Sequence, residues 1–265
     1  MRRILITNDD GIDAPGIIRL ARAARKYGEV WVVAPDGQRS AASHSITLRS
    51  HIDAQEYDFP VPGVKAYAIT GTPADCVRVG TLGLLPGKPD IVFSGINFGY
   101  NAGTDVQYSA TVGAAMEAVF QGIPAVAFSE ATGEGYLVTD QYLEEVLEEV
   151  VDSPFIPGTI VNVNFPACRP EEVHGILRNR TCSTDSIFHD RYDCEKLEDG
   201  GRRFRVNGIF NDKVEEGCDL RALFDHYISI GVVTNTGSPI SNPSKPYKTV
   251  ALCLHSFFLT KAAPS

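Results

Sequence analysis

The sequence predicts an α/β fold with a mostly parallel sheet, followed by a smaller C-terminal part of extended hairpin and loop segments. Strand-like and helix-like segments alternate through roughly the first 165 residues, and the strand-like runs are apolar at consecutive positions. Such runs are typical of strands buried on both faces. At 265 residues, with 43% hydrophobic and 22% charged residues, the chain is long enough for one large domain or for a core with a smaller addition.

Each element follows from its pattern. The first strand is expected at 4–7, and a helix at 15–27, where Ile17, Leu20, Ala21 and Ala24 share one face and Gly28 ends the helix. Further strands are expected at 30–34, 64–69, 91–93, 125–128 and 159–164, and further helices at 106–121 and 136–151. This alternation predicts a Rossmann-like, three-layer core over residues 1–167, with ligands at the carboxyl ends of the strands.

The pattern changes near residue 168, and we expect 168–265 to form the smaller part of what is overall a single domain. The polar stretch 181–204 is predicted to form long loops or an extended hairpin, and 219–233 a short helix running into a strand. A loop-rich tail from Gly237 ends in the apolar run VALCLHSFFL. We expect this part to pack against a second subunit, as a homodimer or homotetramer.

Charge and composition exclude several classes of partner. The net charge of −9 argues against a basic surface for nucleic acid polymers. The apolar run behind Met1 ends at Thr7, too short for a signal peptide, and no stretch approaches the roughly 20 apolar residues of a membrane helix. Six widely spaced cysteines predict a reduced, cytoplasmic protein, although Cys182 and Cys194 flank a polar stretch and could pair.

Two adjacent aspartates end the first strand in ILITNDDG. Asp10 could be a helix N-cap with Asp9 solvated, the pair could hold a cation, or one aspartate could accept a phosphoryl group. Oxygen ligands without nearby His or Cys indicate Mg²⁺, Mn²⁺ or Ca²⁺ rather than zinc. Two unit charges at ~4 Å repel by about 4 kcal/mol at an effective dielectric constant of 20, which a divalent cation would relieve.

A glycine-rich loop follows the strand at 91–93. Gly95, Gly99 and Gly103 alternate with Asn97 and Asn101. Glycines allow backbone N–H groups to approach an anion, and Ser109 and Thr111 could add hydroxyl donors at the next helix start. The loop matches neither the P-loop nor the dinucleotide-binding pattern, and a plain tight turn is the alternative.

The ordered motifs NDDG, PDGQRS with HSIT, GTPADC, and SGINFGYN with YSATV resemble the SurE family of metal-dependent 5′/3′-nucleotidases (survival protein E). The resemblance covers residues 1–130 and returns in GCDLRALFDHYISI at 217–230. It implies that Asp9, Asp10, Ser40 and Asn97 hold one divalent cation per subunit, with Asp9, Asp10 and Asn97 catalytic. It also implies a phosphate pocket formed by Ser40, Asn101, Ser109 and Thr111.

The resemblance implies a phosphomonoesterase that hydrolyses nucleoside monophosphates, 5′ and also 3′ esters, and short polyphosphate, with Mg²⁺ or Mn²⁺ (Ca²⁺ in crystals). Attack by water and an aspartyl-phosphate route through Asp9 both stay open, and acid-quench trapping of a phosphoenzyme would distinguish them. A catalytically silent nucleotide-binding protein is the alternative. A signalling receiver domain fits poorly, because SGIN lacks the later phospho-accepting aspartate.

Two positions depart from the family pattern. Ala110 replaces the glycine of a Ser-Gly-Thr run, which would alter backbone approach to a phosphate, and GVVTNTG at 231–237 replaces a Thr-Pro-Leu strand ending. Several other polar residues are predicted to be structural. These are Arg39 (surface loop), His44 (rather than a general base), Asp75 (capping or bracing the helix that runs to Leu84), Asp13 (solvated turn) and Cys76 (packing).

Overall fold

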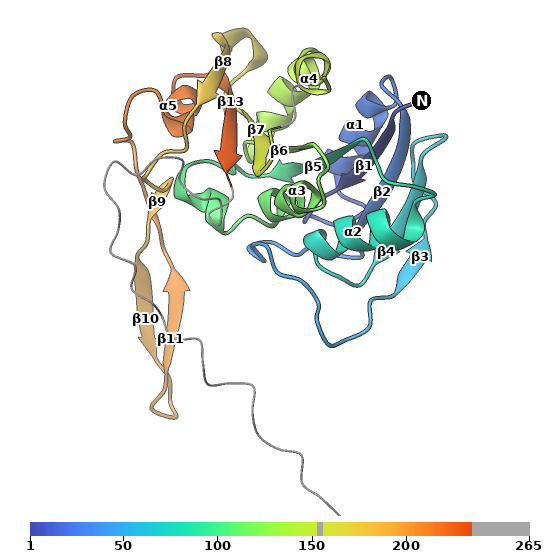
Figure 1. Cartoon of the computed structure of the whole chain (residues 1–265). Helices are drawn as coiled ribbons and strands as arrows, with labels where there is room; N and C mark the ends of the chain where they lie inside the picture. The colour runs from blue at the N-terminus through green and yellow to red at the C-terminus, as the bar shows by residue number, and fades with distance from the viewer. Residues whose placement is uncertain (153–155, 235–265) are drawn as a thin grey trace, which may run out of the picture. The chain divides into compact units, whose positions relative to one another are not determined.

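The computed structural model describes residues 1–152 and 156–234, and its centre is a nine-stranded sheet (Figure 1). The strand order is β3-β4-β2-β1-β5-β6-β7-β13-β8. The six strands from β4 to β7 in that order are mutually parallel, so the predicted mostly parallel α/β fold is confirmed. These six strands are β4 (Lys65–Ile69), β2 (Glu29–Pro35), β1 (Arg3–Thr7), β5 (Ile91–Phe98), β6 (Ala125–Glu130) and β7 (Thr159–Phe165).

Helices cover both faces of the sheet and make the three layers. On one face α1 (Pro15–Ala24) packs with α4 (Tyr136–Val150), and on the other α2 (Pro73–Val79) packs with α3 (Ala110–Phe120). Side chains of a strand alternate between faces, so Ile4 and Ile6 join the core under α1 while Leu5 joins the core under α3. The consecutive apolar residues of a strand therefore pack into two separate hydrophobic cores, one on each face of the sheet.

Three predicted boundaries differ from the structure for local reasons. The strand expected at 91–93 continues to Phe98, so Asn97 lies within β5 rather than after it. The helix expected from 106 is a short 3₁₀ turn (Gly103–Gln107) followed by α3, because the Ser109 hydroxyl accepts from Val112 N–H and caps α3 there. Helix α1 ends at Ala24 rather than 27. The three-residue edge strand β3 (Ala54–Glu56) was not predicted.

Beyond residue 167, two strands return to the sheet. Strand β13 (Tyr227–Thr234) runs antiparallel to β7, and β8 (Gly175–Arg180) pairs beside it. The short helix α5 (Asp219–Phe224) precedes β13 as expected. The division between 167 and 168 stays a prediction, and the tail from 237 lies outside the described residues.

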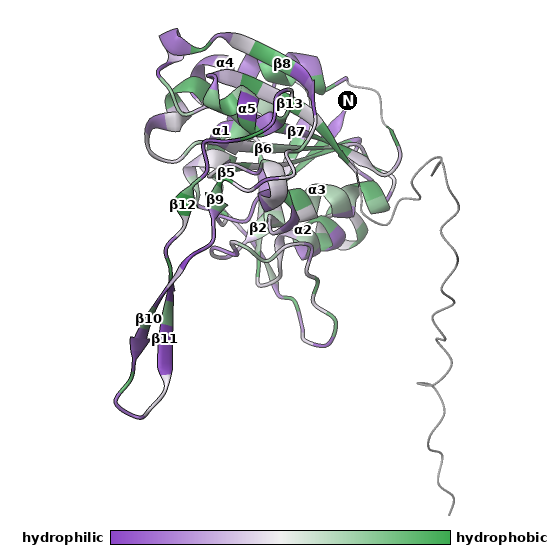
Figure 2. Ribbon diagram, turned by 90° about the vertical axis from the view of Figure 1, so that its left-hand side faces the viewer, coloured by the Kyte–Doolittle hydropathy of each residue, from purple (hydrophilic) through white to green (hydrophobic). Residues whose placement is uncertain are grey.

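The polar stretch forms the predicted hairpin, which extends away from the sheet in Figures 1 and 2. Its strands are β10 (Tyr192–Lys196) and β11 (Arg202–Val206), and β9 (Phe188–His189) pairs with β12 (Ile209–Phe210) at its base. We call residues 188–210 the arm. Figure 2 shows mostly hydrophilic ribbon along it with apolar positions between.

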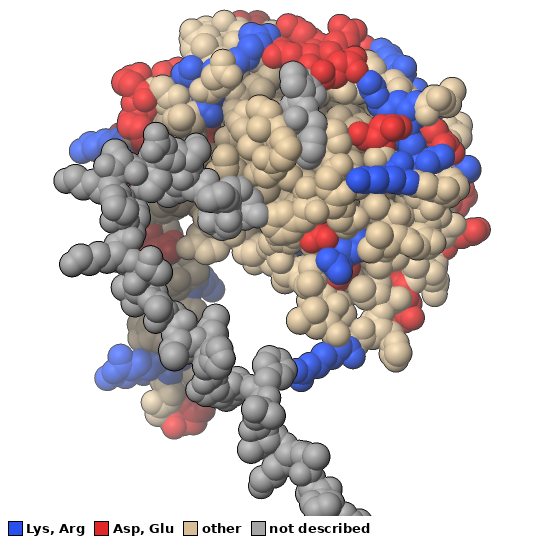
Figure 3. All heavy atoms as spheres, in the orientation of Figure 1, with Lys and Arg blue, Asp and Glu red and all other residues tan. Residues whose placement is uncertain are grey.

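The structure also bears on the expectations about membrane helices, cysteine pairing and surface charge. Within the described ranges, no helix has the length and apolar character needed to cross a membrane. Cys182 and Cys194 are both free thiols. On the face seen in Figure 3, acidic and basic side chains are interspersed.

Gly16 is predicted to be essential for packing α1 against β5. A Cβ at Gly16 would lie 2.1 Å from the carbonyl oxygen of Ile96, a backbone atom next to the predicted ligand Asn97. We expect Gly16→Ala to lower the free energy of unfolding by about 1–3 kcal/mol, as measured by urea denaturation. Gly83→Ala is the matched control, because a Cβ there meets nothing within 4 Å. Equal stability of the two variants would contradict this packing role.

Candidate active site

The predicted site residues lie at the point of the sheet where the order of the strands reverses. Strand β1 lies between β2 and β5, and all three are parallel. Loops leaving the carboxyl ends of such strands diverge and open a crevice. Asp9 and Asp10 follow β1, Ser40 lies in the loop after β2, and Asn97 lies near the end of β5. The topology thus brings all four predicted cation ligands to one edge.

Asp9 is a buried carboxylate held by neutral groups. It is only 3% exposed, its Oδ1 accepts a hydrogen bond from the Thr111 hydroxyl, and its carbonyl accepts from Arg39 N–H at 2.7 Å. The pKa of Asp9 is raised to about 6, mainly by burial. The charge of the neighbouring Asp10 also raises this pKa, and the hydrogen bond from Thr111 opposes the rise. The site therefore keeps a costly negative charge in place.

Asp10 is half-buried and faces β5. Its Oδ2 accepts from the Phe98 backbone N–H at 3.0 Å, which ties the NDDG turn to the end of β5. Burial raises the pKa of Asp10, while hydrogen bonds from Phe98 and from the Gln38 side chain oppose the rise. The alternative of Asp10 as an N-cap does not hold, because Ala14 occupies that position of α1.

Gln38 connects Ser40 to this pair, a role that the sequence did not predict. Its amide Nε2 lies 3.0 Å from Ser40 Oγ, and the same side chain hydrogen-bonds Asp10. Gln38 lies inside the PDGQRS motif, but nothing in its residue type distinguishes it from a solvated loop glutamine. Ser40 itself is exposed and accessible to a ligand.

Asn97 is oriented by its own loop. Its Nδ2 donates to the Gly99 carbonyl at 2.8 Å, which leaves the side-chain oxygen as the group that can act as a ligand. The pairing of β5 with β6 shifts register between Ser94 and Asn97. Gly95 allows this shift: its φ is +135°, and a Cβ would lie 2.3 Å from the Phe128 carbonyl oxygen.

Besides Ser40, three residues are predicted to bind phosphate, and each of them has a hydrogen-bond partner within the protein. Asn101 is 5% exposed; its Nδ2 donates to Ser129 Oγ at 2.7 Å, and its backbone is held by Asn162 and Asn164. Ser109 caps α3, and Thr111 contacts Asp9 directly. Their phosphate-binding roles stay predictions.

The loop that carries Ser40 is attached to two helices. Asp75 accepts hydrogen bonds from the Thr47 N–H and hydroxyl, and it completes a capping box with Thr72. These hydrogen bonds outweigh the effect of burial on the carboxylate, so the pKa of Asp75 is lowered. His44 Nε2 lies 3.0 Å from Glu117 Oε2 on α3. The structural interpretations of both residues therefore fit their contacts.

The other residues predicted to be structural fit as well. Arg39 pairs with Asp36 at 2.8 Å, and Asp13 is exposed, where it accepts from the Tyr57 hydroxyl. Cys76 is fully buried, and burial strongly raises its pKa, which keeps the thiol protonated. Ala110 is fully buried in the first turn of α3, so its methyl group lies against protein atoms.

The donor set fits a hard divalent cation. Two carboxylates, one hydroxyl and one amide oxygen are the ligand types of Mg²⁺ and Mn²⁺. Within residues 1–152 and 156–234, no group of three or more His, Cys, Asp or Glu side chains is placed to hold a metal.

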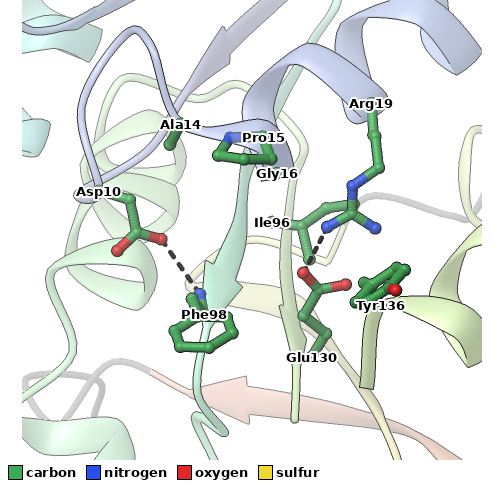
Figure 4. Close-up of a pocket in the computed structure, with 9 residues that line it drawn as sticks. All are labelled: Asp10, Ala14, Pro15, Gly16, Arg19, Ile96, Phe98, Glu130 and Tyr136. Atoms are coloured by element: carbon green, nitrogen blue, oxygen red, sulfur yellow. Dashed lines mark hydrogen bonds and ion pairs between the residues drawn. The ribbon is translucent and has the colours of Figure 1, made fainter. Parts of the chain in front are cut away.

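A cavity adjoins this site on the α1 side (Figure 4). Its volume is about 550 Å³, and Asp10 lines one end of it. Arg19 and Glu130 form an ion pair at the other end. These two residues are 111 positions apart, and no local sequence signal predicts their contact.

Comparisons with known proteins agree with the α/β fold. The family model described as Survival protein SurE matches residues 4–186. A 5′-nucleotidase SurE from Geobacter metallireducens is 47% identical over 233 residues, which cover 86% of this chain and 89% of that protein. One from Clostridium botulinum is 38% identical over 232 residues, covering 86% and 90%. The crystal structure of the SurE protein from Aquifex aeolicus aligns with a TM-score of 0.76 at 33% identity, covering 88% of this chain and 93% of that one.

The buried charge of Asp9 predicts a stability cost in metal-free protein. Its folded pKa of about 6 exceeds the unfolded value near 3.9, so stability falls as pH rises from about 4 to 6 and stays reduced above. In EDTA at pH 8 we expect Asp9→Asn to be more stable than wild type by about 2 kcal/mol in urea denaturation, with the difference lost near pH 4. Added Mn²⁺ should stabilise wild type more than the variant.

Asp13→Asn is the matched control, because Asp13 lies in the same loop but is exposed. We expect it to leave stability in EDTA unchanged at both pH values. An Asp9→Asn variant less stable than wild type at pH 8 would contradict the proposed cost of the buried charge.

Proposed function

The chain belongs to the SurE family, and we propose that it is a divalent-metal-dependent phosphomonoesterase that hydrolyses nucleoside monophosphates to nucleoside and phosphate. One observation carries the proposal: two adjacent carboxylates stand at the carboxyl edge of the sheet, held by neutral donors, with Ser40 hydrogen-bonded to Gln38 and Asn97 directly before Phe98, whose N–H donates to Asp10. The relatives' name supports 5′ esters. We extend the proposal to 3′ esters and short polyphosphate.

Asp9, Asp10, Ser40 and Asn97 would hold one Mg²⁺ or Mn²⁺ ion per subunit. When bound, such an ion supplies electrophilic assistance to a phosphoryl oxygen and lowers the pKa of a water molecule. The chain's contribution is to fix the ligands before substrate arrives: the Thr111 hydroxyl orients Asp9, the Phe98 N–H orients Asp10, and Gln38 joins Asp10 to Ser40. Preorganised ligands need no rearrangement during the reaction.

The phosphoryl group would lie between these ligands and the start of α3. We assign Ser40, Asn101, Ser109 and Thr111 to this pocket, together with the positive end of the 11-residue helix α3. Phosphoryl transfer depends on positioning and charge stabilisation, which is what a rigid loop and a helix terminus provide. The hydrogen bonds that hold Asn101 to Asn162 and Asn164 keep the loop rigid.

We assign Asp9 to the cation and attack on phosphorus to water. Its carboxylate is 3% exposed and one of its oxygens already accepts from Thr111, which leaves little access for in-line attack. The burial of Ala110 gives no support to a silent protein, since its methyl group is turned away from solvent.

We also propose that the chain self-associates through the arm and acts in the cytoplasm, on small phosphomonoesters rather than nucleic acids or membranes. Six large apolar side chains of the arm are more than half exposed, an unusual density for a lone monomer. They are Phe188, Tyr192, Phe204, Val206, Ile209 and Phe210. A homodimer or homotetramer would cover them.

Purified protein is expected to release phosphate from nucleoside 5′-monophosphates with Mg²⁺ or Mn²⁺ and to stop in EDTA. Asp10→Asn should reduce kcat/KM by more than the 10–100-fold typical of a residue that only supports a ligand. Phosphate release is measured for 5′ esters, 3′ esters and tripolyphosphate in parallel. Asp13→Asn, in the same loop, should retain the wild-type rate.

Undiminished hydrolysis in chelator would disprove metal dependence. Hydrolysis of 5′ esters alone would restrict the proposal to that substrate class.

The arm is predicted to set the subunit number. Phe204→Asp with Val206→Asp places two charges on one face of β11, so light scattering should show a smaller species than wild type. Arg203→Ser, one residue away on the opposite face, is the control and should leave the mass unchanged. A monomeric wild-type protein would refute self-association.

A further inference from the structure

Asp219 is a buried carboxylate that the proposed chemistry does not use. It lies in GCDLRALFDHYISI, the stretch at 217–230 that resembles the family but supplies none of the predicted ligands. Asp219 is only 3% exposed. Its Oδ2 accepts a hydrogen bond from Gly103 N–H at 2.9 Å, and its Oδ1 accepts from Ser183 N–H at 2.9 Å and from Leu220 N–H at 2.8 Å. One side chain therefore joins the glycine-rich loop after β5, the segment that leads into the arm, and the start of α5.

The glycine-rich loop fits closely against this part of the chain. The φ of Gly103 is +57°, and a Cβ there would lie 2.3 Å from the carbonyl oxygen of Asp185 and 2.8 Å from Leu220 Cδ1. The next residue, Thr104, donates its N–H to the same Asp185 carbonyl at 3.0 Å. The preceding residue, Ala102, is fully buried in an apolar cluster. The other buried members of that cluster come from α5 and from the residues before it and before the arm, namely Ile187, Cys218, Leu220 and Leu223.

The residue before these three, Asn101, is held by a different element. Its backbone N–H donates to Asn164 Oδ1 at 2.9 Å, and its carbonyl accepts from Asn162 Nδ2 at 2.8 Å. Both asparagines belong to β7. Residues 101–104 are thus fixed by β7 at one end and by the contacts of Asp219 and Asp185 at the other.

The predicted cation ligands are oriented by a separate set of hydrogen bonds. Asp9 accepts from the Thr111 hydroxyl, and Asp10 accepts from the Phe98 N–H. Neither donor lies within 101–104. A shift of that segment would therefore alter the pocket assigned to the phosphate and leave the cation ligands in place.

We propose that Asp219 is a positioning residue, which holds residues 101–104 so that Asn101 lies where it can bind the phosphate of the substrate. The inference rests on the proposed function, which assigns Asn101 to that phosphate. A carboxylate suits this place because both of its oxygens accept, and the N–H groups of Gly103 and Ser183 lie on different segments. An asparagine has only one accepting oxygen, so its amide nitrogen would face one of these N–H groups and displace that segment.

The experiment measures phosphate binding and Mn²⁺ binding separately. In Asp219→Asn we expect the inhibition constant of inorganic phosphate to rise, and kcat/KM for a nucleoside 5′-monophosphate to fall, each by about tenfold or more, since a displacement near 1 Å can cost about 100-fold. The Mn²⁺ dissociation constant, from calorimetry, should stay unchanged. Partial unfolding would only reduce the number of active molecules, so it would lower kcat without changing KM or the phosphate inhibition constant.

Glu215→Gln is the matched control. Glu215 accepts from the Ser183 hydroxyl at 2.6 Å and from Thr184 N–H at 2.9 Å. These bonds hold the same segment before the arm, but they do not reach residues 101–104. We expect this variant to keep the wild-type inhibition by phosphate.

Gly103→Ala is a second variant, which shifts the loop while Asp219 is intact. The added Cβ must move away from the Asp185 carbonyl, so the phosphate inhibition constant should rise, again with unchanged Mn²⁺ binding. Gly133→Ala is its control, because Gly133 has a φ of +73° but a Cβ there meets nothing within 4 Å.

Wild-type inhibition by phosphate in Asp219→Asn, or in Gly103→Ala should Asp219→Asn not fold, would overturn the positioning role and leave the proposed function intact. An equal rise of the inhibition constant in Glu215→Gln would overturn it as well, as would a loss of Mn²⁺ affinity in Asp219→Asn. A wild-type protein that hydrolyses no phosphomonoester would instead overturn the proposed function, and this inference with it.

Discussion

The structure depends on keeping two adjacent carboxylates, Asp9 and Asp10, in place at the end of β1. At about 4 Å, two such charges repel by roughly 4 kcal/mol at an effective dielectric constant of 20, and burial adds to that cost. The hydrogen bonds described for Asp9 and Asp10 come from neutral groups, namely a threonine hydroxyl, a backbone N–H and a glutamine amide. Neutral donors fix the geometry but leave the negative charge available for a bound ion.

Each neutral hydrogen bond contributes only a small free energy, so the loops that carry these donors must themselves be held rigidly. The loop carrying Ser40 is bonded to α2 through Thr47 and Asp75 and to α3 through His44 and Glu117. The loop after β5 is held by Asn162 and Asn164 of β7. Two residues considered as catalytic groups in the sequence, His44 and Asp75, are instead part of these attachments between the loop and a helix.

Sequence reasoning predicted what depends on local pattern. The parallel strands, the helix faces of Ile17 and Leu20, the hairpin arm and the edge where Asp9, Asp10, Ser40 and Asn97 meet all follow from periodicity, strand ends and the motifs. It missed what depends on distant partners: the return of β13 to β7, the Thr111–Asp9 bond and the Arg19–Glu130 pair, whose members are far apart in sequence. The extension of β5 to Phe98 was missed because Gly95 is a poor strand residue, yet only a glycine fits beside Phe128.

The end of β5 couples two parts of the candidate site. The Phe98 backbone N–H positions Asp10, and the neighbouring Asn97 on the same strand end is a predicted cation ligand. A shift of the β5 end would therefore move both groups together, and displacements near 1 Å are costly in a preorganised site.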